Sequence, residues 1–230
     1  MARRIVDLSQ PLNRHTQVHP FFNPPQIVRE LIHVDYPPDR PSFNAELIIT
    51  SNHAATHVDA FGHYDRSERA EAIAEMPLEM FCGPAVCIDV REYGAKGHLV
   101  TPEEAQDALD QADADLERGD ILLFCTDHFN RTAGTPEFLD GFSGIAPDTV
   151  AWMADRGVKI FGVETISPDL TYEYDDYRTH RACAEHRVTH YENLNNLTQV
   201  AGRRFDFFGF PLRLEVAYGS PVRAVGMLDE

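Results

Sequence analysis

The sequence predicts an α/β fold with a mixed sheet, because apolar, β-branched runs alternate along it with a few helical segments. The chain has 230 residues, of which 43% are hydrophobic and 25% are charged, as in an ordinary globular protein with a substantial core. It contains no internal repeat, and its richest Pro/polar stretch, Tyr36–Ser42, is short enough to be a surface loop. We therefore expect one domain over residues 1–230.

Seven runs of apolar and β-branched residues predict strands. In chain order they are Ile5–Leu8, Glu46–Ser51, Ala85–Val90, Asp120–Thr126, Lys159–Thr165, Phe205–Leu214 and Pro221–Leu228. Long strand runs that alternate with only a few helices indicate an α/β domain. We expect its sheet to be mixed, with both parallel and antiparallel neighbours.

Three segments between these runs predict helices. Thr101 is a good N-cap, Pro follows it, and Glu104 stands at the capping-box position, so a helix should run from there to about Leu116. The other two helices are expected over Pro147–Arg156 and from Asp175 to about His186.

The charge balance excludes several classes of partner. The chain has 20 Lys and Arg against 37 Asp and Glu, a formal net charge of −17, and only Lys96 and Lys159 are lysines. Such a surface has no positive field for nucleic acid or for an anionic membrane. We therefore expect a small-molecule substrate, no nucleic acid and no membrane among the partners.

The location is expected to be cytoplasmic. No window reaches the 18 or more apolar residues of a membrane span, and the start Met1–Gln10 meets Asp7 before a signal-peptide run can form. The four cysteines include no Cys-x-x-Cys pair, and most lie in or beside apolar runs, as free buried thiols do.

The densest group of potential metal ligands is His53, His57, Asp59 and His63, within eleven positions. A regular helix would turn Asp59 away from the first two histidines, and a regular strand would separate those two by roughly 13 Å. A turn over the two histidines, followed by extended chain through Asp59, brings all three together. Imidazole and carboxylate at such short spacing are the usual metal set, which favours a metal site over a polar surface loop.

This segment, HAATHVDAFGH, resembles the signature HxGTHxDxPxH of the cyclase family of metal-dependent hydrolases. Ala55 stands where the signature has Gly, and Phe61 where it has Pro. Residues 5–12, 162–169 and 211–225 resemble other parts of the same family. The resemblance implies a swivelling β/β/α fold for the single domain.

The resemblance also implies a fuller ligand set. His180 and Glu192, twelve residues apart, match the ligands of family members that have two metals. His53 and His57 would then hold one ion and His180 another, with Asp59 and Glu192 bridging. His186 and His190 are rivals of His180 for its role. The number of ions, one or two, and their identity, zinc or manganese, both stay open, since these ligands suit both metals.

A metal-dependent hydrolase that opens a C–N or C–O acyl bond of a small amide, cyclic amide or lactone is the function that the resemblance implies. A bound divalent ion lowers the pKa of its water to about 7, which provides a hydroxide, and polarises the substrate oxygen. His63 would act as the general acid/base, although it could instead be a ligand. Alternatives are a kynurenine formamidase proper, a lyase or dehydratase, and a non-catalytic module that binds metal or ligand. His128 and Glu164, near the ends of predicted strands, stay open between pocket and structural roles.

Substrate contacts are expected from the N-terminal segment. Kynurenine formamidases that this chain resembles carry Trp before a Pro here, whereas this chain has His19, followed by Pro20, Phe21 and Phe22. His19 offers less apolar area than indole and a polar edge, and Phe21 or Phe22 could supply a ring. We expect a cyclic amide, imide or lactone to be preferred over N-formylkynurenine. The family precedent also implies a homodimer or larger homo-oligomer.

Overall fold

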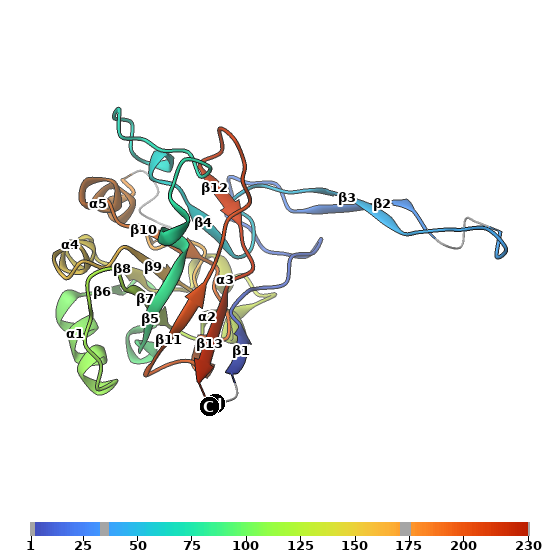
Figure 1. Ribbon diagram of the computed structural model, residues 1–230. Coiled ribbons are helices and arrows are strands. Elements are labelled where there is room, and N and C mark those ends of the chain that lie inside the picture. The colour runs from blue at the N-terminus through green and yellow to red at the C-terminus, as the bar shows by residue number, and fades with distance from the viewer. Residues whose placement is uncertain (1–2, 33–36, 171–175, 230) are drawn as a thin grey trace.

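A nine-stranded mixed sheet forms the centre of the protein in the computed structural model, which describes residues 3–32, 37–170 and 176–229 (Figure 1). From edge to edge its strands are β1 (Arg3–Asp7), β13 (Val225–Asp229), β11 (Arg203–Phe208), β5 (Cys82–Asp89), β7 (Ile121–Cys125), β9 (Ile160–Val163), β10 (Thr189–Glu192), β4 (His57–Asp59) and β12 (Gly219–Pro221). The four strands β5, β7, β9 and β10 are parallel, and the flanking pairs are antiparallel. The predicted α/β class with a mixed sheet is confirmed.

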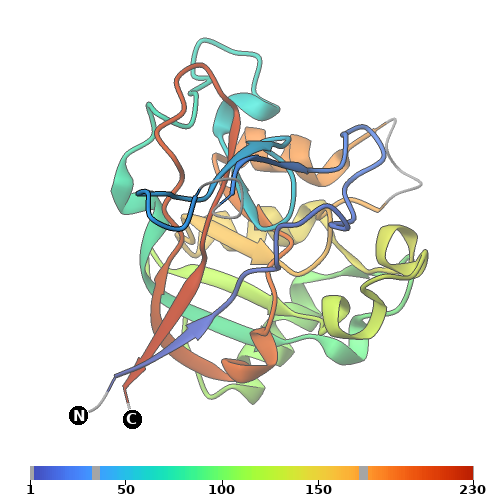
Figure 2. The same cartoon turned by 90° about the vertical axis from the view of Figure 1, so that its right-hand side faces the viewer.

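The central strands are buried on both faces, as their apolar runs predict. In β7, Leu122 and Phe124 belong to the apolar cluster that includes the helices, whereas Ile121, Leu123 and Cys125 belong to the cluster on the opposite face. This alternation follows from the two-residue period of a strand. The second face is closed by the curl of the sheet itself, where β11, β13 and β1 lie (Figures 1 and 2).

Helices cover the other face of the sheet (Figure 1). They are α1 (Pro102–Gln111), α4 (Pro147–Asp155) and α5 (Arg178–His186). The remaining elements include two short helices, α2 (His128–Thr132) and α3 (Glu137–Asp140). A short parallel pair is formed by β6 (Leu99–Val100) and β8 (Gly144–Ile145). None of the described helices has the length and apolar character that crossing a bilayer requires.

Several predicted boundaries were wrong. The first helix ends at Gln111 and not near Leu116, because Asp113 adopts a left-handed conformation with φ of 48°. The third helix begins at Arg178, and its expected start at Asp175 lies outside the described residues.

Two of the predicted strands also differ in extent. The run Phe205–Leu214 is a strand only as far as Phe208. The run Pro221–Leu228 divides into β12 and β13, because residues 222–224 are irregular. The sequence did not predict β2, β6, β8, β10 or the two short helices.

A two-stranded ribbon projects from the body (Figure 1). It consists of β2 (Gln26–Leu31) and β3 (Ala45–Ile49), in a register that pairs Ile27 with Ile48 and Val28 with Leu47. Neighbouring positions on a strand point to opposite faces, so both faces of the ribbon carry apolar side chains. These four side chains are 42–55% exposed.

Candidate metal centre

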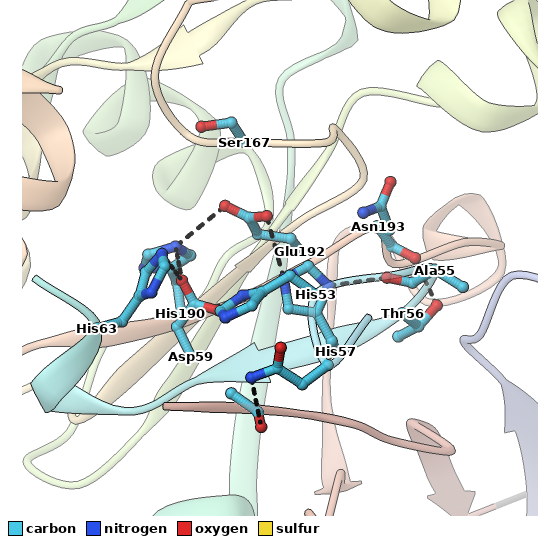
Figure 3. Close-up of polar contacts among 12 residues, drawn as sticks. His53, Ala55, Thr56, His57, Asp59, His63, Ser167, His190, Glu192 and Asn193 are labelled. Atoms are coloured by element: carbon cyan, nitrogen blue, oxygen red, sulfur yellow. Dashed lines mark hydrogen bonds and ion pairs between the residues drawn. The ribbon is translucent and has the colours of Figure 1, made fainter. Parts of the chain in front are cut away.

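Two short neighbouring strands supply most of the candidate ligands. β4 and β10 are antiparallel, and His57 lies directly opposite Glu192 in their register. Residues two apart on a strand share a face, so His57 and Asp59 point to the same side as His190 and Glu192. The four polar side chains are buried, and Figure 3 shows them converging.

A tight turn precedes β4 and directs His53 toward the same point. The backbone N–H of Ala54 donates to the carbonyl of Ser51, and Ala55 adopts a left-handed φ of 54°. The chain is then extended through Asp59, which is the turn-and-strand geometry expected from the spacing. Thr56 fastens this turn to the end of β10, because its hydroxyl donates to the carbonyl of Asn193.

One pole of the cluster lies around Oδ1 of Asp59. His53 Nδ1 is 2.8 Å and His57 Nε2 is 3.4 Å from this oxygen, and His57 Nε2 is also 3.2 Å from Oε2 of Glu192. Candidate ligand atoms of His53, His57 and Asp59 lie within 4.8 Å of one another. Gly219 of β12 makes room for the His53 ring, since a Cβ there would lie 2.6 Å from its Cε1.

The second pole lies around Oδ2 of Asp59 and Oε1 of Glu192. His180, on α5, places Nε2 3.7 Å from each of these oxygens. Its other ring nitrogen, Nδ1, donates a 2.6 Å hydrogen bond to Asp169. The structure thus brings His180 and Glu192, expected through the resemblance, into one cluster with Asp59.

His190 belongs to the same cluster, although the sequence presented it as a rival of His180. Its Nε2 lies 3.2 Å from Oε1 of Glu192 and 3.5 Å from Oδ2 of Asp59. On a strand, the His-x-Glu spacing would have predicted that His190 and Glu192 share a face, but β10 was not predicted. The other rival, His186, is exposed at the end of α5 and lies in neither group of candidate ligands.

His63 lies beside the cluster, in a 3-10 helix (Phe61–His63) that directly follows β4. Its Nε2 is 3.6 Å from Oδ2 of Asp59, and its ring lies 4.3 Å from that of His53. The side chain is 27% exposed, more than those of the other cluster residues. Burial lowers the pKa of His63 to about 4, so its imidazole is neutral at physiological pH.

Aromatic residues line a pocket that opens on the cluster. His19, Phe21 and Phe22 contribute from the N-terminal segment, together with Tyr64 and Tyr177. The ring of Phe22 is stacked on that of His53, with centroids 5.5 Å apart and an angle of 11° between the planes. Phe21 is 70% exposed at the rim. The N-terminal segment therefore lines the pocket, and its Phe22 ring packs on the candidate ligand His53.

Two residues left open by the sequence lie outside the cluster. His128 is buried, and its Nε2 donates to the carbonyl of Phe138, 3.0 Å away. Glu164 accepts hydrogen bonds from the backbone N–H groups of Thr126 and Leu197, which lie on separate segments. Both side chains have structural partners.

Comparison with known proteins identifies the family. The cyclase family model, described as "Putative cyclase", matches residues 6–170. The kynurenine formamidase of Bordetella pertussis is 33% identical over 225 residues, which cover 97% of each chain. The chain belongs to the cyclase family. The kynurenine formamidase of Salinibacter ruber is also 33% identical, over 81% of each chain.

Solved structures of cyclase-family proteins share this fold. Isatin hydrolase A from Ralstonia solanacearum superimposes with a TM-score of 0.86 at 27% identity, over 99% of this chain and 92% of that one. An isatin hydrolase bound to the product analogue thioisatinate superimposes with a TM-score of 0.87 at 19% identity, over 99% and 93%. The protein is thus a cyclase-family hydrolase related to kynurenine formamidases and isatin hydrolase.

The electrostatics of this cyclase-family cluster call for a cation. In the part of the chain that the structure describes, Asp59 and Glu192 form ion pairs only with histidines. Burial acts against the charge of His57, but Asp59 and Glu192 outweigh it and raise its pKa to about 10. Without a metal, buried carboxylates therefore draw protons onto the imidazoles, because a buried charge is costly unless it is compensated.

The donor set fits a metal ion. Among the described residues, His57 Nε2 and both carboxylate oxygens of Asp59 are buried without a hydrogen bond, although nitrogen and oxygen atoms lie close together. Buried polar groups normally have hydrogen-bond partners, so each such atom requires an explanation. Atoms that converge without hydrogen-bonding one another are arranged as ligands of a common ion, and imidazole with carboxylate is a usual set for divalent metals.

Proposed function

We propose that the protein is a metal-dependent hydrolase that opens the C–N or C–O acyl bond of a small amide, cyclic amide or lactone. The observation that carries this proposal is that the buried carboxylates of Asp59 and Glu192 meet histidine nitrogens and, among the described residues, form no ion pair with Lys or Arg. Membership of the cyclase family and relatives that are named hydrolases support it.

His53 and His57 would hold one ion and His180 a second, with Asp59 and Glu192 between them. Zinc and manganese both suit these ligands, and one ion or two per chain are compatible with them. A divalent ion bound there supplies Lewis acidity, which lowers the pKa of water to about 7 and polarises a substrate carbonyl.

His63 is placed to move the proton. Its imidazole is neutral because burial lowers the pKa to about 4, and its Nε2 faces both Asp59 and the pocket. In our proposal Nε2 takes the proton from the attacking water. It then returns that proton to the leaving nitrogen or oxygen, so that the imidazole is regenerated.

The aromatic wall formed by His19, Phe21 and Phe22 would orient the substrate and exclude water. Rings at this position favour a planar substrate, because stacked aromatic contacts add to the free energy of apolar burial. Unlike the indole of Trp, which can only donate a hydrogen bond, the imidazole of His19 also has a ring nitrogen that can accept one.

Kynurenine formamidase proper is the second candidate function. The curated relatives with 33% identity bear that name, whereas the isatin hydrolases, whose name refers to another compound, share the fold with TM-scores of 0.86 and 0.87. The two candidates share one ligand cluster and differ in the substrate that fits the aromatic wall.

Metal analysis combined with a hydrolysis panel tests the proposal. Purified wild-type protein should hold divalent metal and hydrolyse at least one amide, cyclic amide or lactone. His53→Ala and Asp59→Ala should lose most of the metal and nearly all activity. His186→Ala, an exposed histidine outside the cluster, should lose neither. A His53/Asp59 double variant that keeps stoichiometric metal would end this proposal.

We also propose a single domain and a homodimer or larger homo-oligomer. The large sheet includes strands from both ends of the chain, β1 and β13, which supports one domain over residues 1–230. The exposed apolar faces of the β2–β3 ribbon support self-association, because an isolated two-stranded ribbon is marginally stable in water. A monomer across micromolar concentrations in light scattering would contradict the proposed oligomer.

We further propose a cytoplasmic location, which the four free cysteines support.

A further inference from the structure

We propose that His190 is itself a metal ligand, which completes a four-residue set with Asp59, His180 and Glu192. This inference rests on the proposed metal-dependent function and extends its ligand set. Candidate ligand atoms of the four residues all lie within 4.8 Å of one another, and all four side chains are buried. The resemblance to the family implied no role for His190 beyond that of a rival to His180.

The surroundings of His190 fix which ring nitrogen faces the cluster. One face of the ring is stacked on Phe161, with centroids 5.2 Å apart and 28° between the planes. Nδ1 is directed toward the thiol of Cys183, 3.8 Å away, in the apolar layer under α5. The ring is therefore held in place from behind, and Nε2 is left to face the carboxylates.

Nε2 of His190 faces two carboxylate oxygens at once. It makes a 3.2 Å hydrogen bond with Oε1 of Glu192 and lies 3.5 Å from Oδ2 of Asp59. A nitrogen that faces two carboxylates is placed to share an ion with both of them. His180 has the same arrangement, since its Nε2 is 3.7 Å from each of these oxygens.

A second imidazole at this pole changes which metal ion the site prefers. Two nitrogens and two carboxylates suit zinc or cobalt, whereas manganese tolerates a site dominated by oxygen. His190 should therefore raise the affinity of this pole and favour zinc over manganese.

Metal titration of three variants tests the assignment. Wild type, His190→Leu, His190→Gln and the control His186→Gln are stripped with chelator and titrated with zinc, manganese and cobalt chlorides. Calorimetry measures stoichiometry and Kd, and visible absorption records the ligand field of bound cobalt. We expect both His190 variants to bind at least one zinc ion about 10- to 100-fold more weakly, with a changed cobalt spectrum and a smaller preference for zinc. The control should match wild type.

The glutamine variant separates a ligand from a positioning residue, because its amide can still donate to Glu192. His190→Gln with the Kd values and cobalt spectrum of wild type would overturn the assignment and leave the metal site standing. A wild-type protein that binds no metal would overturn the proposed function and this inference together. If His190→Leu does not fold, as circular dichroism would reveal, the glutamine variant alone decides.

Discussion

Asp169 holds His180 in place through a 2.6 Å hydrogen bond from the imidazole Nδ1 to the carboxylate Oδ2. The same carboxylate accepts the backbone N–H groups of Thr179 and His180 at 2.7 and 3.0 Å. It therefore satisfies free N–H groups in the first turn of α5 and at the same time leaves His180 Nε2 free to face Asp59. The start of the helix and the orientation of the His180 ring therefore depend on one side chain.

Replacement of Asp169 by Asn should weaken the hold on His180. Oδ1 of Asp169 accepts the N–H of Thr179, and Oδ2 accepts both N–H groups of His180, whereas the amide of Asn has only one acceptor oxygen and no charge. Zinc affinity should fall about 10- to 100-fold, while Asp169→Ala should also lose about 1 kcal/mol of stability with the cap. Competition with a chromophoric chelator gives the Kd, and urea unfolding gives the stability. An Asp169→Asn protein with wild-type affinity would refute this role.

His63→Asn should keep the metal and lose turnover. If His63 moves the proton without binding the ion, kcat should fall by about 10²- to 10⁴-fold at unchanged metal content. Elemental analysis and steady-state kinetics on the same preparation check both numbers. Loss of the ion from His63→Asn would make His63 a ligand.

Ala55→Gly should stabilise the fold. Ala55 has a φ of 54°, and this conformation costs any residue with a Cβ about 1–2 kcal/mol. Glycine avoids that cost, but part of the gain is lost because glycine makes the unfolded chain more flexible. We expect a net gain of about 1 kcal/mol and a rise in Tm of roughly 2–4 °C. The neighbour Ala54 does not have a positive φ, so Ala54→Gly should be destabilising. Calorimetry that found equal shifts for both would contradict the strain at Ala55.

Glu104 should contribute stability that disappears in acid. Its carboxylate accepts the backbone N–H of Thr101 at 2.9 Å and lies 2.8 Å from His98. Burial acts to raise the pKa of Glu104, but the hydrogen bonds from Thr101 and His98 outweigh it and hold the pKa below its usual value. A carboxyl whose pKa is lower in the folded state stabilises the fold above its unfolded pKa, near 4.5, and loses this as the pH falls through the folded value.

Glu104→Gln should thus be less stable than wild type at pH 7, by about 0.5–1 kcal/mol, with the difference shrinking as the pH falls below 4.5. Urea unfolding at several pH values measures it. Glu103→Gln, at an exposed position in the same turn, should change stability by less than about 0.5 kcal/mol. A Glu104 difference that stayed constant with pH would rule out the charge as its source.

The aromatic wall predicts the order of substrates. With His19 in the pocket, kcat/KM should be higher for a cyclic amide, imide or lactone than for N-formylkynurenine. His19→Trp should shift this ratio toward N-formylkynurenine, because indole offers a larger apolar ring for the substrate's aryl group. Parallel measurements on both proteins decide the matter. A clear preference of wild type for N-formylkynurenine would establish the second candidate function instead.

Local patterns in the sequence predicted much of the fold. The apolar runs located β5, β7 and β9, and the Thr101–Glu104 capping box located the start of α1. The short spacing of His53, His57 and Asp59 was enough to predict a turn followed by extended chain, because only that geometry lets them converge.

Contacts between distant segments were not readable in the same way. His190 and Glu192 lie on a four-residue strand whose polar residues are buried, so its pattern does not look like that of a core strand. Asp169 becomes a partner of His180 only because a loop packs across the start of α5. His180 and Glu192 were expected through the resemblance alone, since twelve residues of chain do not specify their meeting.

If Asp59 and Glu192 hold a metal as proposed, their burial on adjacent strands links metal occupancy to folding. An ion that binds these residues only in the folded chain acts as a cross-strand brace between β4 and β10, which pair over just two residues. At a free concentration 100 times its Kd, such an ion would stabilise the fold by about 2.7 kcal/mol. Chelation would therefore lower the melting temperature together with the activity, and stability compared between preparations has meaning only at a stated metal concentration.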